Sequence, residues 1–185
     1  TDSVTLNNTA TAADDMGDGN ALVVNGYETV NIVSTNTGAT ESQDFGVITM
    51  TADTGGSSIL NFSGTNAVTT GVITAGTVNL SGLTAQDAGT STFTMVGNLV
   101  GGTTNTITGS AGEDTIVGDA NDTTNIDGGA GDDTITGGSD AETISGGADD
   151  DTIDGADGAD TLNGDAGDDT ITGGTGNDTI NGGAG

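Results

Sequence analysis

Seven carboxylates recur in register along residues 109–185 of this 185-residue chain, 19 residues apart for the first two and nine residues apart from there on. They are Asp114, Asp133, Glu142, Asp151, Asp160, Asp169 and Asp178. Carboxylate oxygens are hard ligands, and the chain has no His or Cys that would favour zinc or copper. The residue type and the spacing therefore predict a series of sites for a hard cation, and Ca²⁺ is the ion that such all-oxygen ligands suit best.

Each carboxylate takes the sixth position of a nine-residue repeat, whose other positions predict how it is held. Positions one, two and four are mostly Gly, as expected for tight turns with positive φ or close backbone packing. Asp140, Asp149 and Asn121 replace Gly at position four, and Asp and Asn best tolerate the left-handed conformation. Positions seven to nine predict a short strand with an aliphatic side chain pointing inward and Thr pointing outward. The aliphatic residues are Ile116, Ile135, Ile144, Ile153, Leu162, Ile171 and Ile180.

Two repeat units predict one solenoid turn of eighteen residues, with a sheet on each side and a loop at each end. Loops two units apart should stack at about 4.8 Å, the spacing of neighbouring strands, so that a cation between them contacts carboxylates and carbonyls of both loops. The predicted stacked pairs are Asp133/Asp151, Asp151/Asp169, Glu142/Asp160 and Asp160/Asp178. The predicted metal sites also include the loop glycines Gly129, Gly131, Gly138, Gly147, Gly158, Gly167, Gly174 and Gly176. The alternative, a solvated acidic linker, has no reason to keep one aliphatic residue every nine residues.

Residues 109–185 resemble the repeats-in-toxin (RTX) family, whose unit is GGxGxDxUx. Residues 128–136 (GGAGDDTIT) and 173–181 (GGTGNDTIN) fit this unit at every defined position. The resemblance implies a parallel β-roll with Ca²⁺ between its loops and folding that Ca²⁺ triggers outside the cell. Members of the family are secreted bacterial toxins, proteases, lipases, adhesins and surface-layer proteins.

Three departures from the unit carry expectations of their own. Residues 118–127 (GDANDTTNID) form a ten-residue unit, so we expect one turn to bulge and its site to be lost. Glu142 replaces Asp, and its longer side chain should change how that site coordinates the ion. Position two is not Gly in four units, where it is Ser110, Asp119, Ala156 or Asp165.

Residues 1–108 are rich in Thr, Asn, Gly, Ser and Ala, and their short alternating apolar stretches predict strands and no helix. The expected strands are 21–24, 29–33, 47–51, 58–62, 72–74, 77–80 and 92–96. We therefore predict an all-β chain with two parts. Residues 1–108 form a Thr/Asn/Gly-rich β domain, either an irregular β-solenoid, which we favour, or a sandwich. It is continuous with the RTX β-roll of residues 109–185. A short acidic loop at Asp14, Asp15 and Asp18 is a further candidate Ca²⁺ site.

The charge of the chain excludes several classes of function. It has 28 acidic residues and no Lys, Arg or His, and 19 of the acidic residues fall within 109–185. No internal salt bridge can form, so without a counter-ion this segment should be a disordered polyanion, and bound Ca²⁺ would convert the repulsion into folding free energy. Nucleic acid and direct attraction to an anionic membrane are excluded, whereas a Ca²⁺ bridge to surface glycan or lipopolysaccharide remains open. No apolar run reaches the roughly 20 residues of a membrane span.

The function predicted from these features is a calcium-binding structural protein of a secreted, extracellular bacterial assembly such as a surface layer, sheath or filament, which self-associates on Ca²⁺ binding. The segment 26–35 also resembles segments of surface-layer proteins and large adhesins. The alternatives are a calcium-dependent folding module of a type I-secreted enzyme or toxin, and an adhesin stalk. We expect no enzyme activity, because the usual catalytic side chains are missing. A water-ordering surface made by the outward Thr rows is a further alternative. The chain begins at Thr1 and stops within a repeat, so we interpret it as a fragment of a longer protein.

Overall fold

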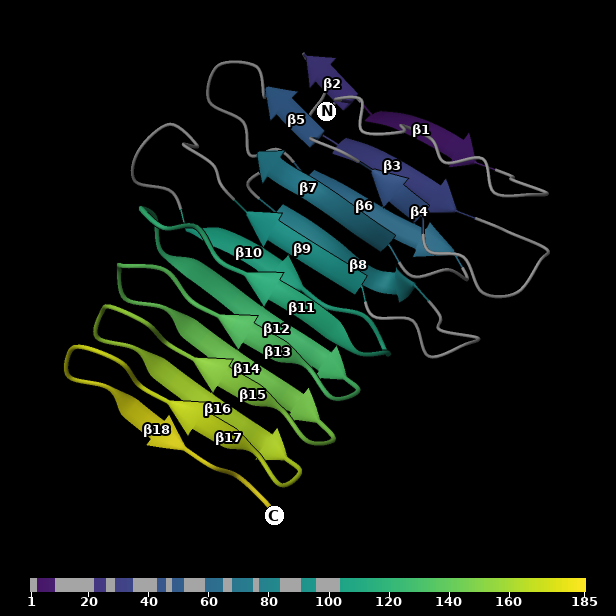
Figure 1. The fold of residues 1–185 in the computed structure, drawn as a ribbon. Coiled ribbons are helices and arrows are strands. Elements are labelled where there is room, and N and C mark those ends of the chain that lie inside the picture. The colour runs from purple at the N-terminus through teal and green to yellow at the C-terminus, as the bar shows by residue number, and fades with distance from the viewer. Residues whose placement is uncertain are drawn as a thin grey trace.

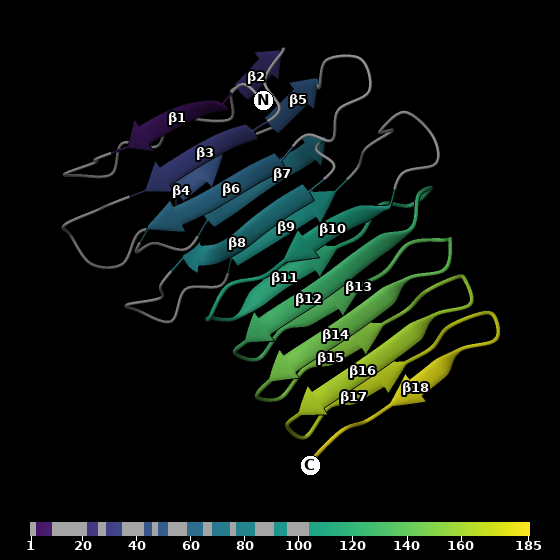
Figure 2. The same cartoon turned by 180° about the vertical axis from the view of Figure 1, so that it is seen from behind.

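Parallel β-strands build the protein, which winds as a solenoid from its N-terminal to its C-terminal strands (Figures 1 and 2). The computed structural model describes residues 3–8, 22–25, 29–34, 43–45, 48–51, 59–64, 68–74, 77–83, 91–95 and 104–185. The regular elements of these residues are all β-strands. This arrangement confirms the predicted all-β class and the β-roll, and it decides between the two expectations for the N-terminal part in favour of a solenoid.

The strands form two sheets of nine strands each, and the chain alternates between them. The first sheet contains, in spatial order, β1 (Ser3–Asn8), β3 (Thr29–Ser34), β6 (Ile59–Gly64), β8 (Thr77–Leu83), β10 (Asn105–Thr108), β12 (Thr124–Ala130), β14 (Thr143–Ala148), β16 (Thr161–Ala166) and β18 (Thr179–Asn181). The second contains β17 (Thr170–Thr172), β15 (Thr152–Asp154), β13 (Thr134–Thr136), β11 (Asp114–Val117), β9 (Ser91–Met95), β7 (Val68–Thr74), β5 (Ile48–Thr51) and β2 (Leu22–Asn25), with β4 (Gln43–Phe45) paired to β7.

The register of the C-terminal strands confirms the predicted eighteen-residue turn. Ile126 pairs with Ile144 in the first sheet, and Ile135 pairs with Ile153 in the second. Hydrogen bonds between successive loops likewise join residues 18 positions apart. The turn before them is longer, since Asp114 bonds to Asp133 across 19 positions. The ten-residue unit thus adds one residue to a single turn, and the strands on either side of it keep their pairing.

A ladder of aliphatic side chains fills the space between the sheets. Ile107, Ile116, Ile126, Ile135, Ile144, Ile153 and Leu162 are each at most 3% exposed. The flanking threonines of positions seven are exposed from β13 onward, as the alternation of side chains along a strand requires. The core is therefore one residue wide in the strands from β10 to β16, whereas Ile180 in the last strand, which has no further turn beside it, is 51% exposed. The buried polar and charged side chains of residues 104–185 lie at the loop ends of the turns.

The N-terminal strands follow the same course with longer and unequal turns. Ser3 pairs with Thr29 and Thr29 with Ile59, which are steps of 26 and 30 residues. All seven expected strands exist, with bounds shifted by a few residues; β1 and β4 were not expected. The candidate site at Asp14, Asp15 and Asp18 lies outside the described residues. Both sheets continue across the boundary predicted at residues 108 and 109, and the division into two domains stays a prediction.

The glycines of the loops adopt the backbone that the repeat predicts at positions two and four. Seven of the eight glycines predicted at the metal sites have positive φ, from 91° at Gly174 to 154° at Gly167. The exception is Gly138, which is absent from the left-handed region. At position four Asp149 has a φ of 80°, whereas the expectation was wrong for Asp140 and Asn121. A helix long and apolar enough to cross a membrane is not found in the described part of the chain.

Candidate calcium-binding loops

The loops at the two ends of each turn present the position-six residues in two stacks. We call the Asp133 side the loops that lead into β11, β13, β15 and β17, and the Asp160 side those that lead into β12, β14, β16 and β18. The Asp133 side carries Asp114, Asp133, Asp151 and Asp169. The Asp160 side carries Glu142, Asp160 and Asp178. All four predicted stacked pairs are confirmed, because each pair is joined by a hydrogen bond.

Successive acids of a stack are joined by a hydrogen bond from a backbone N–H to a carboxylate oxygen. The N–H of Asp133 donates to Oδ1 of Asp151 at 2.9 Å, and the N–H of Asp151 donates to Oδ1 of Asp169 at 2.9 Å. On the other side, the N–H of Asp160 donates to Oδ1 of Asp178 at 3.1 Å. A charged acceptor makes such a bond roughly twice as strong as a neutral one. One oxygen of five of these carboxylates is thereby fixed by the preceding turn, whereas Oε2 of Glu142 accepts the N–H of Gly138 in its own loop at 3.1 Å.

The second carboxylate oxygen of five of these acids has no hydrogen-bond partner. Oδ2 of Asp133, Asp151, Asp160 and Asp169 and Oε1 of Glu142 are all buried and unpaired. Asp133 and Asp160 are 1% exposed, so water reaches these groups poorly. A buried carboxylate without a partner is costly, and the chain has no Lys, Arg or His that could supply a positive charge. The counter-charge must therefore come from an ion in solution.

The pKa values of these groups rise for the same reason. Burial raises the pKa of Asp133 to about 8, and the neighbouring charges of Asp114 and Asp151 add to the rise. Burial, and then the charge of Asp160, raises the pKa of Glu142 to about 7. Burial raises the pKa of Asp151 to about 6, with Asp169 adding to the effect, and burial also raises the pKa of Asp160. Without a cation the folded loops favour protonated carboxyl groups.

Position-one glycines line the same space, and sequence reasoning missed their role. A Cβ on Gly155 would lie 2.6 Å from Oδ2 of Asp160 and 2.7 Å from the carbonyl oxygen of Gly173 in the next turn. The corresponding carboxylate oxygen crowds Gly128, Gly146, Gly164 and Gly173 in the same way. Two oxygens from successive turns therefore converge on a point that only a glycine leaves open. The signal was present in the sequence, because position one is Gly in every unit from Gly109 to Gly182.

This donor set fits Ca²⁺, which takes six to eight oxygen ligands and accepts backbone carbonyls among them. No three acidic side chains converge on one point within the described residues. Each site would thus combine one or two carboxylates with carbonyl oxygens of the glycine-rich loops. The position-six carboxylates would hold the ions, and the positive-φ glycines would let successive loops approach closely. That these particular atoms ligate Ca²⁺ stays a prediction.

Thr124 explains what happens at the ten-residue unit. Asn125 pairs with Thr143, so Thr124 takes the place that Glu142 has in the next turn. Asn105 takes the same place in the turn before, because it pairs with Thr124. Neither side chain is charged, and the stack of acids on the Asp160 side therefore begins at Glu142. At the ten-residue unit, where a lost site is predicted, the neutral residue Thr124 stands where the later turns have acids.

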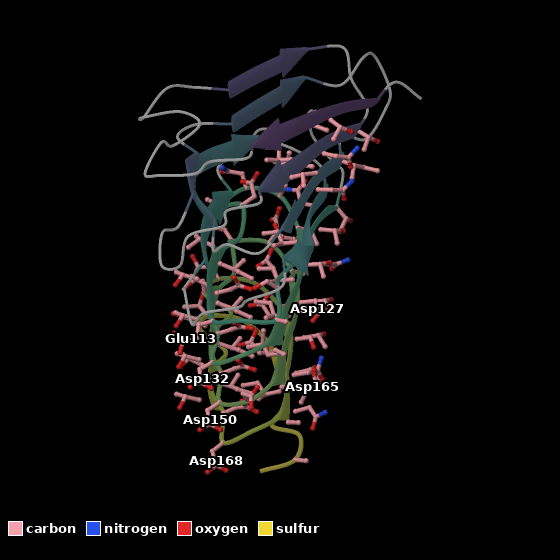
Figure 3. All side chains as sticks on the ribbon, turned by 90° about the vertical axis from the view of Figure 1, so that its right-hand side faces the viewer. Glu113, Asp127, Asp132, Asp150, Asp165 and Asp168 are labelled. Atoms are coloured by element: carbon pink, nitrogen blue, oxygen red, sulfur yellow. The ribbon has the colours of Figure 1, made fainter. Side chains whose placement is uncertain are left out.

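A second row of acids lies on the outside of the Asp133 side. Figure 3 shows Glu113, Asp132, Asp150 and Asp168 following one side of the roll. The N–H of Asp150 donates to Oδ1 of Asp132 at 3.1 Å, and that of Asp168 donates to Oδ1 of Asp150 at 2.8 Å. These groups are exposed, so water solvates them and they need no ion for the fold.

Comparison with known proteins identifies the repeat. The model of the RTX calcium-binding nonapeptide repeat (4 copies) matches residues 100–123, 121–153 and 154–185. The match begins nine residues before the segment assigned from the sequence, and it includes Asn105 at position six and Ile107 at position eight of one more unit. No curated protein and no solved structure matches the chain.

Proposed function

Because residues 100–185 belong to the RTX calcium-binding nonapeptide repeat family, we propose that this chain is a calcium-dependent structural element of an extracellular assembly. RTX nonapeptide repeats bind Ca²⁺. The structural role is supported by the continuity of the two sheets, which join the strands of residues 3–95 to the repeats without a change of architecture. The chain is thus one extended scaffold with a calcium-binding portion.

Calcium acts in this proposal as the counter-charge that folding requires. The unpaired oxygens of the stacked carboxylates oppose folding when no ion is present, and they become ligands when Ca²⁺ binds. Binding free energy then becomes folding free energy. Extracellular calcium modules have a Kd of about 10⁻⁴–10⁻³ M, so the repeats would stay unfolded at low calcium and fold where calcium is abundant. Proteins with RTX repeats are generally secreted, which agrees with folding outside the cell.

A non-catalytic role follows from the side chains that the chain contains. It has no His, Cys, Lys or Arg, which removes the usual nucleophile–base pairs and phosphate clamps. Acids that are adjacent in the sequence lie in different environments: Asp132 is exposed on the outside of its loop, and Asp133 is buried inside it. We therefore assign the carboxylates to ion binding.

Copies of the chain associate with one another through Ca²⁺ in this proposal. The outer row of carboxylates on the Asp133 side offers a regular anionic surface along the roll (Figure 3). Two such surfaces repel each other in the absence of divalent ions, and Ca²⁺ between them would join two copies, or one copy and an anionic glycan or lipopolysaccharide. The same ion would then fold the subunit and link it to its neighbours.

Sedimentation velocity in EDTA and in millimolar Ca²⁺ tests this role, with KCl at equal ionic strength as the control for screening. The proposal predicts a slow, expanded monomer in EDTA and in KCl, and large reversible species in Ca²⁺. Compaction to a monomer that stays monomeric in Ca²⁺ would instead favour a folding and secretion module or an adhesin stalk. Sedimentation that is the same in all three buffers would contradict calcium-driven folding itself.

A further inference from the structure

Glu142 is the only glutamate among the seven acids at position six, and it comes directly after a neutral position six. Thr124 holds the same place in the turn before, where it is buried and uncharged. A glutamate side chain is one methylene longer than an aspartate side chain. The longest acid of its stack therefore lies next to the place where an acid is missing.

The loop of Glu142 follows the same backbone course as the loop of the turn before it. The N–H of Gly138 donates to Oε2 of Glu142 at 3.1 Å, and the N–H of Asp119 donates to the hydroxyl oxygen of Thr124 at 3.2 Å. Gly138 and Asp119, both at position two, do not have positive φ, whereas Ala156 at position two of the next loop on this side has a φ of 69°. The loops of Asp119 and Gly138 therefore form a pair that differs from the loop after them.

The free oxygen of an ordinary acid in this stack approaches the turn that comes after it. Oδ2 of Asp160 is buried and unpaired, and a Cβ on Gly155 would lie 2.6 Å from it and 2.7 Å from the carbonyl oxygen of Gly173. At Gly137, the corresponding glycine of the Glu142 loop, the closest carboxylate oxygen is Oε2, at 3.4 Å. That oxygen already accepts a hydrogen bond in its own loop. The oxygen of Glu142 that lacks a partner is therefore not the one nearest to the usual space.

Oε1, the unpaired oxygen of Glu142, instead approaches the turn before. A Cβ on Gly138 would lie 2.0 Å from the carbonyl oxygen of Asp119 and 3.4 Å from Oε1 of Glu142. At the other described glycines of position two, the three nearest atoms are all backbone atoms. Glu142 is 2% exposed, so water reaches Oε1 poorly. Ca²⁺ binds oxygens at about 2.3–2.6 Å, so one ion can join oxygens up to about 5 Å apart. These two oxygens approach the same point and can therefore share an ion.

The carboxylate of Asp119 adds negative charge close to this space. Asp119 is 1% exposed, and its side chain belongs to the same residue as the carbonyl oxygen beside Gly138. Its Oδ1 accepts the N–H of Asn121 at 2.9 Å, a bond within the loop. Asp119 and Glu142 thus bury two carboxylates in successive loops, and the chain has no Lys, Arg or His to neutralise them. A divalent cation between the two loops would offset the cost of burying both charges.

The usual space for an ion is lined by carbon in the ten-residue unit. The three atoms nearest to a Cβ on Gly118, at position one, would all be carbon atoms at 3.4 to 3.5 Å, from Ile126, Gly137 and Thr124. This agrees with the sequence prediction that the usual site is lost in this unit. It leaves the space beside Gly138 as the place where the two loops can hold a cation.

We infer that Glu142 binds Ca²⁺ through Oε1 together with the carbonyl oxygen of Asp119, in the space beside Gly138. The ten-residue unit then keeps a cation site although its own position six is neutral. Glutamate is required at residue 142 because its extra methylene brings the carboxylate to the turn before. The inference rests on the calcium binding proposed above, and it adds the residues and the place of one site that the repeat itself does not predict.

Isothermal titration calorimetry of Ca²⁺ into the calcium-free 185-residue chain tests the inference by counting the ions bound per chain. Glu142→Asp should bind one ion fewer than the parent, because its carboxylate no longer reaches the carbonyl oxygen of Asp119. An ordinary position-six role predicts an unchanged count, since Asp is the residue that the repeat uses there. Asp127→Glu changes the length of an acid by the same methylene at an exposed place on β12, and it should bind as many ions as the parent.

Two glycine variants make the test independent of a change at residue 142. Gly138→Ala places a methyl group against the carbonyl oxygen of Asp119, and it should bind one ion fewer. Because Gly138 does not have positive φ, this replacement adds no strain from a left-handed backbone. Gly118→Ala, whose Cβ has ordinary contacts, should bind as the parent does. Far-UV circular dichroism in Ca²⁺ should show the β signal of the parent for each variant.

The outcomes separate this inference from the proposed function. Calcium binding by the parent, together with an unchanged ion count for Glu142→Asp, would overturn the inference alone. An unchanged count for Gly138→Ala would contradict the place of the ion, and a lost ion in Gly118→Ala would return it to the usual space. A parent chain that binds no Ca²⁺ would overturn both the inference and the proposed function.

Discussion

Replacing Asp151 by Asn is the most informative single change in the roll, because Asp151 lies between two other members of its stack. Its Oδ1 accepts the N–H of Asp133, and its own N–H donates to Asp169. Its Oδ2 is buried and unpaired, as a cation ligand would be in the absence of its ion. Asn keeps an acceptor for the backbone bond and removes the charge from the sites on both sides of it.

The size of the effect follows from the number of sites that share the residue. The charge of the ligands tunes calcium affinity, and the loss of one carboxylate from a site is taken as about 1.4 kcal/mol, a tenfold change in Kd. Two sites weakened in a cooperative transition should raise the calcium midpoint by about threefold to tenfold. In EDTA the variant should show slightly more β structure than the parent chain, because one buried charge is gone.

Calcium titration followed by far-UV circular dichroism measures both effects, with Asp157→Asn as the matched control. Asp157 is an exposed acid at position three, and its Oδ1 accepts a hydrogen bond from the hydroxyl of Thr175. The side-chain oxygen of Asn can accept the same bond. Its substitution should move the midpoint by less than twofold, since an exposed, screened charge contributes little. Equal midpoints for the two variants would show that the register of the repeat is wrong and would refute the reasoning.

Three further predictions concern pH, backbone strain and the glycines at position one. Without calcium, lowering the pH from 8 to 5 should increase β structure. Burial raises the pKa of Asp133 to about 8 and that of Glu142 to about 7 in the folded state, so the folded state binds more protons than the unfolded chain. The stability of the folded state therefore falls as the pH rises through this range. Ala156→Gly should stabilise the calcium-bound roll by about 1 kcal/mol in thermal unfolding, because Ala156 has a φ of 69°. Gly155→Ala should abolish calcium binding at the neighbouring site in isothermal titration calorimetry, whereas Gly182→Ala, with nothing within 4 Å of the added Cβ, should bind as the parent does.

Each of these predictions has an outcome that contradicts it. Circular dichroism in EDTA that does not change between pH 8 and 5 would mean that the buried carboxylates do not oppose folding. Ala159→Gly is the control for Ala156→Gly, because Ala159 is an exposed loop residue without positive φ. Glycine at this position should lower the stability of the roll, because it adds backbone freedom to the unfolded chain. Equal effects of the two substitutions would contradict the strain at Ala156. Equal calcium stoichiometry for Gly155→Ala and Gly182→Ala would contradict the oxygen-lined space beside Gly155.

The regular turns could be predicted because every part of the unit repeats. A nine-residue period with one carboxylate and one aliphatic residue fixes which side chains share a face, and the eighteen-residue turn and the stacked acid pairs follow from it. Ile135 is buried and Thr134 is exposed, as the alternation of side chains along a strand requires. Local rules were sufficient here because each turn contacts identical neighbours.

The turn that contains the ten-residue unit could not be predicted, because its register depends on where one extra residue is accommodated. Residues 118–127 offer Asp122, Thr123 and Thr124 as candidates for position six, and sequence alone does not choose among them. Pairing with β14 selects Thr124. The hydroxyl of Ser110 was recorded as a departure from glycine, and only the three-dimensional arrangement shows that it donates to Asp114.

Pairing of the N-terminal strands is beyond sequence reasoning for a related reason. Turns of 26, 30 and 18 residues separate Ser3, Thr29, Ile59 and Thr77, so no fixed period marks the partners. The apolar alternation found most of the strands, but β4, of sequence QDF, has no such signal. Which strand lies beside which is set by contacts between residues far apart in the chain, such as the bond from Asn61 to Asn31 at 2.9 Å.

The central claim is that Ca²⁺ folds the repeats by ligating buried carboxylates, and far-UV circular dichroism in three buffers tests it most directly. The buffers are EDTA, EDTA with KCl added to the ionic strength of the calcium sample, and Ca²⁺ at about 10⁻³ M, the upper end of the range for extracellular calcium modules. We predict a large gain of β signal in Ca²⁺ alone. An equal gain in KCl would show that screening of the 28 negative charges is sufficient, and it would contradict the claim.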